Sequence, residues 1–531
     1  MTTWWQSAVV YQVYPRSFAD SDGNGVGDLR GVIDMLDYLS DTLGVDAIWL
    51  SPFYPSPMKD FGYDVSDFCD VDPIFGTLED FDELLSSAHD RGLRIIIDLV
   101  PNHTSDRHPW FIESRSSRIN PKRDWYVWRD PKEDGSPPNN WLSGFGGKAW
   151  RLDELTGQYY LHSFLVSQPD LNWRNPQVQE AMFDVVRFWL DRDVDGFRLD
   201  VAHLIMKDPE LRDNPPAPFV DASFKALGEY DAQLHLYDKG HPDVHRVFRD
   251  LRAVVDSYPG DRFTVGEIHI FDFDEWAKYY GDDLDELHMP FNFSLIWAPW
   301  DAGRFRQLVE AVEASVPEGG WPNYVLGNHD ERRLVGRYGA DQARVAAMLL
   351  LTLRGTPTLY YGDELGLTNA EIPRDRQQDP WSLQEPTVES RDGCRTPMPW
   401  DGSPTAGFSP PGSAKPWLPI PDDHRQLNVD AQFENPRSML HLYRRLLEFR
   451  RGSDVLRFGS YRSLRTAEGV FAYERTLGAE RLVVALNFTE DERVVSTGPG
   501  EIEVSTDMDR DGPVQKRLIL RSHEGVILRP A

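Results

Sequence analysis

The feature that most constrains the fold is a series of short apolar runs separated by amphipathic stretches. Runs of this length and composition are typical of strands buried on both faces of a parallel sheet. The stretch before GFRLDVA carries five apolar residues at the spacing of one helical face, namely Val178, Met182, Val185, Val186 and Trp189. The runs are VVYQVYP at 9–15, DAIWLSP at 46–52, LRIIIDLV at 93–100, GFRLDVA at 196–202, RFTVGEI at 262–268, NYVLGNHD at 323–330 and TPTLYYGDE at 356–364. Repeated strand–helix units over roughly 450 residues predict an α/β fold, a (β/α)₈ TIM barrel with insertions.

Two long segments and a tail depart from this alternation. Residues 104–167 lack a helical period and are rich in Pro, Trp, Gly and charge, which indicates a subdomain inserted after the third strand. Residues 365–432 are rich in Pro and Asp, and loops this long at a barrel end are usually functional. Short β-like runs after the last helix predict an antiparallel β-sandwich at 453–531. The barrel would therefore occupy 1–103 and 168–452.

The bulk composition excludes several classes of protein. A formal net charge of −30 disfavours binding to nucleic acid or to an anionic membrane. Two distant cysteines, Cys69 and Cys394, do not support a disulfide scaffold. The first residues lack a basic region followed by an apolar one, and no apolar run of about 20 residues occurs. We expect a soluble cytoplasmic protein, a monomer or homodimer, whose partners are small molecules.

Polar residues gather where the apolar runs end. Barrel enzymes place their catalytic residues at the carboxyl ends of different strands. So many carboxylates at equivalent strand ends, accompanied by His and Arg, are not expected to be helix caps alone. These residues are Asp98, Asn102 and His103 at the end of the third run, Arg198 and Asp200 at the end of the fourth, Glu267 at the end of the fifth, and His329 and Asp330 at the end of the run at 323–330.

Two of these carboxylates fit the chemistry of glycoside cleavage. Arg198 and Asp200 are two residues apart on a strand, so their side chains point the same way. A neighbouring guanidinium favours the ionised aspartate that a nucleophile requires. Glu267 would need the reverse, a raised pKa, to protonate a leaving oxygen. A pair with opposed environments is typical of retaining glycosidases.

Four ordered motifs resemble those of glycoside hydrolase family 13, the α-amylase family. They are DLVPNH at 98–103, GFRLD at 196–200, VGE at 265–267 and NHD at 328–330. QPDLNW at 168–173 resembles an additional motif of the oligo-1,6-glucosidase branch. The resemblance covers essentially the whole chain, including the inserted subdomain and the C-terminal sandwich.

The resemblance implies a role for each matching residue. Asp200 would be the nucleophile, Glu267 the acid/base, and Asp330 would hold the 2- and 3-hydroxyls of the glucose. His103 and His329 would bond other hydroxyls, with Arg198 supporting Asp200. The non-reducing end of the sugar would be held by Tyr63 as a stacking platform and by Asp64 and Arg395 as polar clamps. Phe145, Phe164 and Phe293 are candidates for pocket walls, with packing in the core as the alternative.

The resemblance implies a retaining, exo-acting α-glucosidase, because a pocket closed by Asp64 and Arg395 admits one terminal glucose. Val201 resembles the residue of relatives that accept α-1,6 links, where α-1,4 specialists carry Thr. The same scaffold could instead serve sucrose hydrolysis, net glucosyl transfer, or formation of trehalose or isomaltulose. The 365–432 loop and the 204–245 insertion would decide between water and a sugar as acceptor. A non-catalytic sugar-binding relative is a remote alternative.

The loop DSDGNGVGD after the first strand predicts a structural Ca²⁺ site. Asp20, Asp22, Asn24 and Asp28 stand at positions 1, 3, 5 and 9, and Val26 could offer its carbonyl. Hard oxygen donors at this spacing suit calcium better than a transition metal. A polar turn without an ion is the alternative. Family relatives also carry a cation in this loop, and no organic cofactor is expected.

Overall fold

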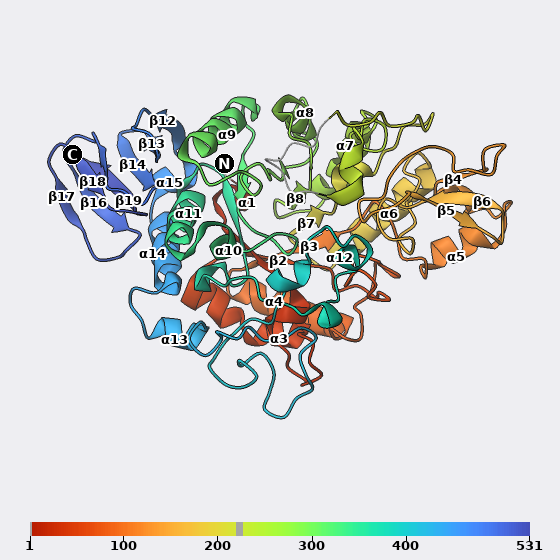
Figure 1. The fold of residues 1–531 in the computed structure, drawn as a ribbon, viewed down its shortest axis with the longest axis horizontal. Coiled ribbons are helices and arrows are strands. Elements are labelled where there is room, and N and C mark those ends of the chain that lie inside the picture. The colour runs from red at the N-terminus through yellow and green to blue at the C-terminus, as the bar shows by residue number, and fades with distance from the viewer. Residues whose placement is uncertain (1–2, 219–226) are drawn as a thin grey trace.

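A parallel barrel forms the centre of the computed structural model, which describes residues 3–218 and 227–531 (Figure 1). Within these residues, eight strands form one sheet in the order β10-β11-β1-β2-β3-β7-β8-β9, with parallel neighbours. Together with the surrounding helices they confirm the predicted TIM barrel. The strands are β1 (Val10–Val13), β2 (Ala47–Leu50), β3 (Arg94–Leu99), β7 (Gly196–Leu199), β8 (Phe263–Gly266), β9 (Met289–Pro290), β10 (Asn323–Val325) and β11 (Thr356–Tyr360).

The apolar runs identify every strand of the barrel except β9. This strand has two residues, too few for any periodic signal. It lies at the seam of the barrel, next to β10. There the Asn323 side chain bridges the two strands: its Nδ2 donates to the Pro290 carbonyl at 2.5 Å, and its Oδ1 accepts from the Asn292 amide at 3.0 Å.

Helices cover the outside of the barrel (Figure 1). All five apolar residues that the sequence analysis assigned to one face of α6 (Pro176–Leu190) are buried. Helix α4 (Leu78–Asp90) begins with a capping box of Thr77 and Asp80, whose side chains accept from each other's backbone amides. The remaining long helices of the barrel are α7 (Val244–Asp256), α9 (Ala302–Ser315), α11 (Ala340–Thr352) and α14 (Met439–Arg451), with the shorter α3 (Leu29–Asp34) and α10 (Leu334–Tyr338).

The segment that follows β3 forms a separate layer at one side of the barrel (Figure 1). It holds α5 (Pro109–Ser116) and an antiparallel sheet of β4 (Trp128–Arg129), β6 (Gln158–Leu161) and β5 (Trp150–Asp153). The sequence analysis missed α5 because this eight-residue helix has little amphipathic pattern. Its start is fixed by Pro109 in the first turn and by the His108 ring, which accepts from the Trp110 amide.

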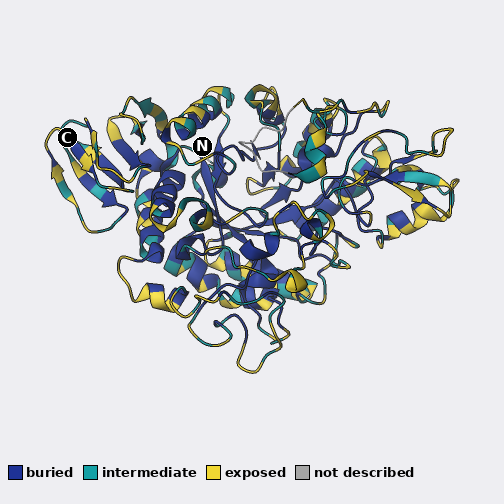
Figure 2. Ribbon diagram, viewed as in Figure 1, coloured by how far each residue is buried: buried dark blue, intermediate teal, exposed yellow. Residues whose placement is uncertain are grey.

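The C-terminal region lies on the opposite side of the barrel and is built from two antiparallel sheets (Figure 1). The larger sheet contains β12 (Ser460–Leu464), β13 (Val470–Leu477), β14 (Glu480–Asn487), β19 (Gly525–Pro530), β16 (Gly500–Ser505) and β17 (Gly512–Val514); the smaller contains β15 (Arg493–Val495) and β18 (Leu518–Leu520). Its strands surround an aliphatic core: β13 and β14 are each buried at six of their eight residues and are accessible only near the turn that joins them, while the short β18 alternates. The barrel strands are buried almost throughout (Figure 2). Among the described residues, no helix is both long and apolar enough to cross a membrane.

Candidate active site

One buried arginine joins three carboxylates at the carboxyl ends of neighbouring strands. Strand pairing places Asp98 of β3 opposite Arg198 of β7. Nη1 of Arg198 lies 2.6 Å from Asp98 Oδ1 and 2.9 Å from Asp200 Oδ1, and Nη2 lies 2.5 Å from Glu267 Oε2. The Arg198 side chain is 1% exposed. Three of the strand-end carboxylates found in the sequence therefore meet around one guanidinium, while Asp330 contacts Arg391 and Arg395.

The pKa values of Asp200 and Glu267 depend on each other and on Arg198. Burial raises the pKa of Asp200, Arg198 opposes this, and the charge of Glu267 raises the pKa further. Burial also raises the pKa of Glu267, but Arg198 and His269 outweigh burial and hold it below its ordinary value. The sequence analysis expected a raised pKa for Glu267. The shifts run opposite to both expectations, an ionised Asp200 and a protonated Glu267, because Arg198 contacts both carboxylates instead of Asp200 alone.

The residue after Asp200 has an unusual backbone. Val201 has φ 36° and ψ 43°, the left-handed region that a β-branched residue rarely adopts. This conformation points its amide at Glu267 Oε2, 3.1 Å away. The strained turn therefore links the end of β7 to the end of β8, and both carboxylates face the same cavity.

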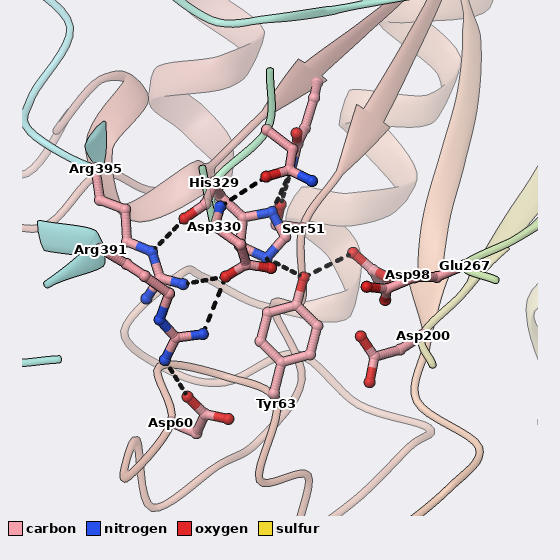
Figure 3. A network of polar contacts seen from close by, with 12 residues as sticks. Ser51, Asp60, Tyr63, Asp98, Asp200, Glu267, His329, Asp330, Arg391 and Arg395 are labelled. Carbon is pink, nitrogen blue, oxygen red and sulfur yellow. Dashed lines mark hydrogen bonds and ion pairs between the residues drawn. The ribbon is translucent and has the colours of Figure 1, made fainter. Parts of the chain in front are cut away.

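Tyr63 and His329 form a stacked pair in the cavity wall. Their rings are 5.3 Å apart with an interplanar angle of 1°, and Tyr63 Oη lies 2.8 Å from His329 Nε2. Burial lowers the pKa of His329 to about 3, so the ring is neutral near pH 7. Its Nδ1 accepts from the Gln12 amide at 2.7 Å, which leaves the proton on Nε2, towards Tyr63. Figure 3 shows Tyr63 with Asp200 and Glu267 to one side and Asp60 and Arg391 to the other.

His103 is held by polar groups from two motifs. Its Nε2 lies 3.2 Å from the Tyr63 carbonyl and 3.1 Å from the Gln168 side-chain amide. Burial lowers the pKa of His103 to about 4, so this ring is also neutral near pH 7. The Gln168 amide also donates to Asp60 Oδ2 at 3.0 Å. Through Gln168 the QPDLNW motif thus connects His103 to the carboxylate of Asp60.

A second buried arginine, Arg391, joins carboxylates from three loops. Its guanidinium lies 3.2 Å from Asp60 Oδ1, 3.0 Å from Asp330 Oδ1 and 2.7 Å from Asp379 Oδ1. Phe145 and Trp381 lie beside the guanidinium, with ring centroids 5.1 and 5.7 Å away. Burial raises the pKa of Asp60 to about 6, although Arg391 opposes the shift. This group closes one side of the cavity.

The structure corrects the placement of Asp64 and Arg395, which the sequence analysis expected to clamp the sugar. Asp64 is fully buried and accepts from the Ser56 hydroxyl and from the Lys59 and Asp60 amides, so it shapes the turn behind the cavity. Arg395 is 1% exposed and donates to Asp330 Oδ1 and to the His329 carbonyl. Arg395 therefore orients Asp330 from behind. The cavity itself is lined at these two places by Asp60 and Arg391.

The three predicted aromatic walls divide in the same way. Phe145 and Phe164 line the cavity, with ring centroids 5.3 Å apart. Phe293 is 4% exposed and lies outside the lining, beneath His269. The expectation that Phe293 is a wall is wrong, because the His269 ring covers it.

The predicted metal loop brings its acidic side chains together. Asp20, Asp22 and Asp28 each offer a carboxylate oxygen, and these oxygens lie within 4.8 Å of one another. Asp20 and Asp28 are buried and Asp22 is exposed. Asn24 Oδ1 accepts from the Val26 amide at 2.8 Å, so this oxygen already has a partner within the loop. Three hard oxygen donors at this separation fit a Ca²⁺ ion.

Comparison with known proteins decides the family. Residues 12–459 match the model of the alpha-amylase catalytic domain. This chain belongs to the α-amylase family, glycoside hydrolase family 13. It is 47% identical over 501 residues to a probable α-glucosidase of Rhizobium meliloti (strain 1021), covering 92% of this chain and 90% of that relative.

Further relatives define the branch of the family. The chain is 41% identical over 525 residues to an oligo-1,6-glucosidase of Parageobacillus thermoglucosidasius, covering 92% of this chain and 91% of the relative. Among solved structures, the α-glucosyl transfer enzyme XgtA superposes with a TM-score of 0.92 at 46% identity, with full coverage of both chains. The chain is therefore a glycoside hydrolase of the α-glucosidase and oligo-1,6-glucosidase branch.

The family motifs led to the strand-end residues but not to three others that line the cavity, namely Asp60, His269 and Arg391. The part of the buried Gln168, which donates to Asp60, was also missed. Asp60 and Asp64 are four residues apart, as are Arg391 and Arg395. Each pair consists of two identical residues close together in the sequence, and the sequence gives no physical reason to choose one over the other. Gln168 lies in a quoted motif, and His269 follows Glu267 by two residues.

Proposed function

We propose that this chain is a retaining, exo-acting α-glucosidase that removes a terminal α-linked glucose from short oligosaccharides or disaccharides. The observation that carries the proposal is the convergence of Asp200 and Glu267 on one face of a cavity whose other side is closed by Asp60 and Arg391. Two carboxyls beside one sugar site match the two-step chemistry of retaining glycosidases.

The residues divide this chemistry between them. Asp200 attacks the anomeric carbon while the bond to the leaving oxygen breaks, and Glu267 gives its proton to that oxygen. In the second step Glu267 takes a proton from water, which displaces Asp200 from the sugar. Arg198 keeps Asp200 oriented and compensates charge on both carboxyls. Asp330, held by Arg391 and Arg395, faces the cavity and would accept from sugar hydroxyls.

The exo-action follows from the group around Arg391. An endo-acting enzyme needs an open groove on both sides of the scissile bond. Here Asp60, Arg391 and the Phe145 and Trp381 rings gather on one side of the cavity, which favours the binding of a single terminal glucose there. The neutral rings of His103 and His329 line the cavity without adding charge.

Net glucosyl transfer is the second candidate, favoured by the likeness to an α-glucosyl transfer enzyme. Both activities share the glucosyl-Asp200 intermediate and differ in the acceptor that resolves it. The acceptor side of the cavity includes Leu227, Tyr230 and Lys239 from the 204–245 insertion. Residues 219–226 of that insertion lie outside the described residues.

Proton NMR of fresh enzyme with maltose, isomaltose, trehalose, sucrose and soluble starch tests the proposal. We expect α-glucose as the first product from small sugars, with starch nearly untouched. If a new disaccharide dominates, the enzyme is a transferase or isomerase. If β-glucose forms first or starch is cleaved internally, the retaining exo-glucosidase is wrong.

We also propose that the loop at 20–28 holds a structural Ca²⁺ ion. The support is the set of carboxylate oxygens of Asp20, Asp22 and Asp28, with the Asn24 oxygen and the Val26 carbonyl as further donors. The loop lies outside the cavity lining, so the ion takes no part in the chemistry. A chelator should lower Tm by about 2–4 °C, and added Ca²⁺ should restore it. A Tm unchanged by the chelator and by Ca²⁺ would rule the site out.

A further inference from the structure

His269 and Arg198 contact different oxygens of the acid/base carboxyl. It follows Glu267 by two residues, beyond the end of β8, and its Nε2 lies 2.6 Å from Glu267 Oε1. The ring stacks on Phe293 (4.8 Å between centroids, 9°) and on Trp297 (5.2 Å, 26°). Such packing fixes the ring plane, so the direction of Nε2 is set by the protein. His269 also lines the cavity.

The two oxygens of Glu267 have different partners. Oε2 accepts from Arg198 Nη2 at 2.5 Å and from the Val201 amide at 3.1 Å. Donation from a guanidinium and an amide favours the unprotonated form of this oxygen. A proton on Glu267 therefore belongs on Oε1, where His269 is the neighbouring group. The proton that reaches the leaving oxygen therefore comes from Oε1, next to His269 Nε2.

We propose that His269 is a positioning residue for Glu267, holding Oε1 towards the leaving oxygen and exchanging one proton with it between the two steps of the reaction. The inference rests on the proposed function, in which Glu267 is the acid/base. His269 acts only through Glu267 and makes no bond to the sugar.

The exchange balances without any further reactant. Before the first step the N–H bond of the His269 imidazolium breaks and an O–H bond forms on Glu267 Oε1, which turns an ion pair into a neutral pair. The leaving oxygen then takes that proton as its bond to the anomeric carbon breaks. In the second step Glu267 takes a proton from water and returns it to His269 Nε2.

The surroundings of His269 favour this exchange. Phe293 and Trp297 add no titrating group, and their faces favour a cation. His203 from the segment after β7 lies 5.5 Å away between ring centroids, and burial, then His269 and Lys239, hold its pKa well below the ordinary value. His203 is thus neutral and does not compete for the proton. The charged groups that act on the pair through Glu267 and the cavity are Arg198, Asp200, Asp98, Asp330 and Lys239.

The pH profile of kcat/KM separates the two parts of the role. His269→Gln places an amide near the position of Nε2 and cannot titrate, so it should keep kcat within about threefold at acid pH. Its alkaline limb should shift to lower pH by at least about one unit, because the pair loses the proton that His269 carries and keeps only the one that Glu267 itself binds. His269→Phe keeps the stacking but loses the contact, and its kcat on maltose should fall about 10- to 100-fold.

The leaving group gives an independent readout. If His269 acts through the proton of Glu267, His269→Phe should lose much less activity on p-nitrophenyl α-glucoside, whose leaving group needs little protonation, than on maltose. Equal losses on both substrates with an unshifted alkaline limb in His269→Gln would overturn the proposal and leave His269 a packing residue.

Two controls separate this proposal from the proposed function. His245 forms a similar contact with Glu286 at 2.8 Å, outside the cavity, so His245→Gln should leave the pH profile unchanged. Glu267→Gln should abolish activity on maltose. If Glu267→Gln stays active, the assignment of the acid/base fails; if it is inactive and both His269 variants match the parent enzyme, only the role of His269 fails.

Discussion

Two buried arginines organise the cavity, and they are built in different ways. Arg198 joins Asp98, Asp200 and Glu267, which come from the adjacent strands β3, β7 and β8. Arg391 joins Asp60, Asp330 and Asp379, which come from three loops. Each network places one cation among three carboxylates. Only the first has its geometry set by the register of a parallel sheet.

The difference separates chemistry from recognition. In the first network Asp98 and Arg198 are at most 1% exposed, so the distances that govern bond making rest on the most rigid part of the molecule. In the second, Asp330 is 27% exposed and the partners lie on long loops, which can differ between enzymes without disturbing the barrel. We therefore expect the Arg198 network to govern kcat and the Arg391 network to govern which sugar binds.

The largest effect should come from removing the nucleophile. Asp200→Asn keeps the shape of the side chain but cannot attack, and kcat should fall at least about 10⁴-fold while the fold is retained. Initial rates on maltose together with circular dichroism check this. A variant with near-normal kcat would remove Asp200 from the mechanism and leave the Arg198 network a structural feature.

Arg198→Lys should be the next most damaging change. Lysine keeps the positive charge but cannot place one nitrogen against Asp200 and another against Glu267. We expect kcat to fall about 10²-fold, with KM changed much less. Arg391→Lys is the matched variant in the other network and should mainly raise KM. If both variants change mainly kcat, or both change mainly KM, the division of roles between the two arginine networks is wrong.

A smaller effect distinguishes Asp60 from Asp64. Asp60 lines the cavity and Asp64 does not, although they are four residues apart. Losing a charged hydrogen-bond acceptor costs about 1.5–3 kcal/mol, so Asp60→Asn should lower kcat/KM about 10- to 100-fold. Asp64→Asn should change kcat/KM less than about threefold and act on stability. Steady-state kinetics on isomaltose decide, and the reverse order of effects would restore Asp64 as the sugar clamp.

The smallest effect concerns stability and not activity: the free energy of unfolding should depend on pH through the buried carboxyls. Burial raises the pKa of Asp98 and of Asp60 from 3.8 to about 6, so the native state binds more protons than the unfolded chain between those values. The stability this adds is complete below about pH 4 and is lost as pH rises through about 6, with about 3 kcal/mol from each group. Urea unfolding from pH 4 to 7 should show a smaller fall for Asp60→Asn. An unchanged slope would mean that Asp60 titrates normally.

The same contrast explains what the sequence could predict. Asp98, Arg198, Asp200 and Glu267 were found because strand ends of a parallel barrel converge, and short apolar runs reveal where the strands end. Asp60 and Arg391 were missed because the conformation of a loop leaves no periodic pattern. The lowered pKa of Glu267 was missed for a related reason: sequence placed Arg198 beside Asp200 and could not show that its second nitrogen reaches Glu267.

The central claim is that Asp200 carries the glucosyl group between the two steps, and covalent trapping tests it most directly. The enzyme would be incubated with 5-fluoro-α-glucosyl fluoride, which slows the second step, and then analysed by intact mass and peptide mapping. The account predicts one fluoroglucosyl adduct per chain, on the peptide that contains Asp200, and none in Asp200→Asn. An adduct on Glu267 or Asp330, or turnover with α-glucose release in Asp200→Asn, would contradict it.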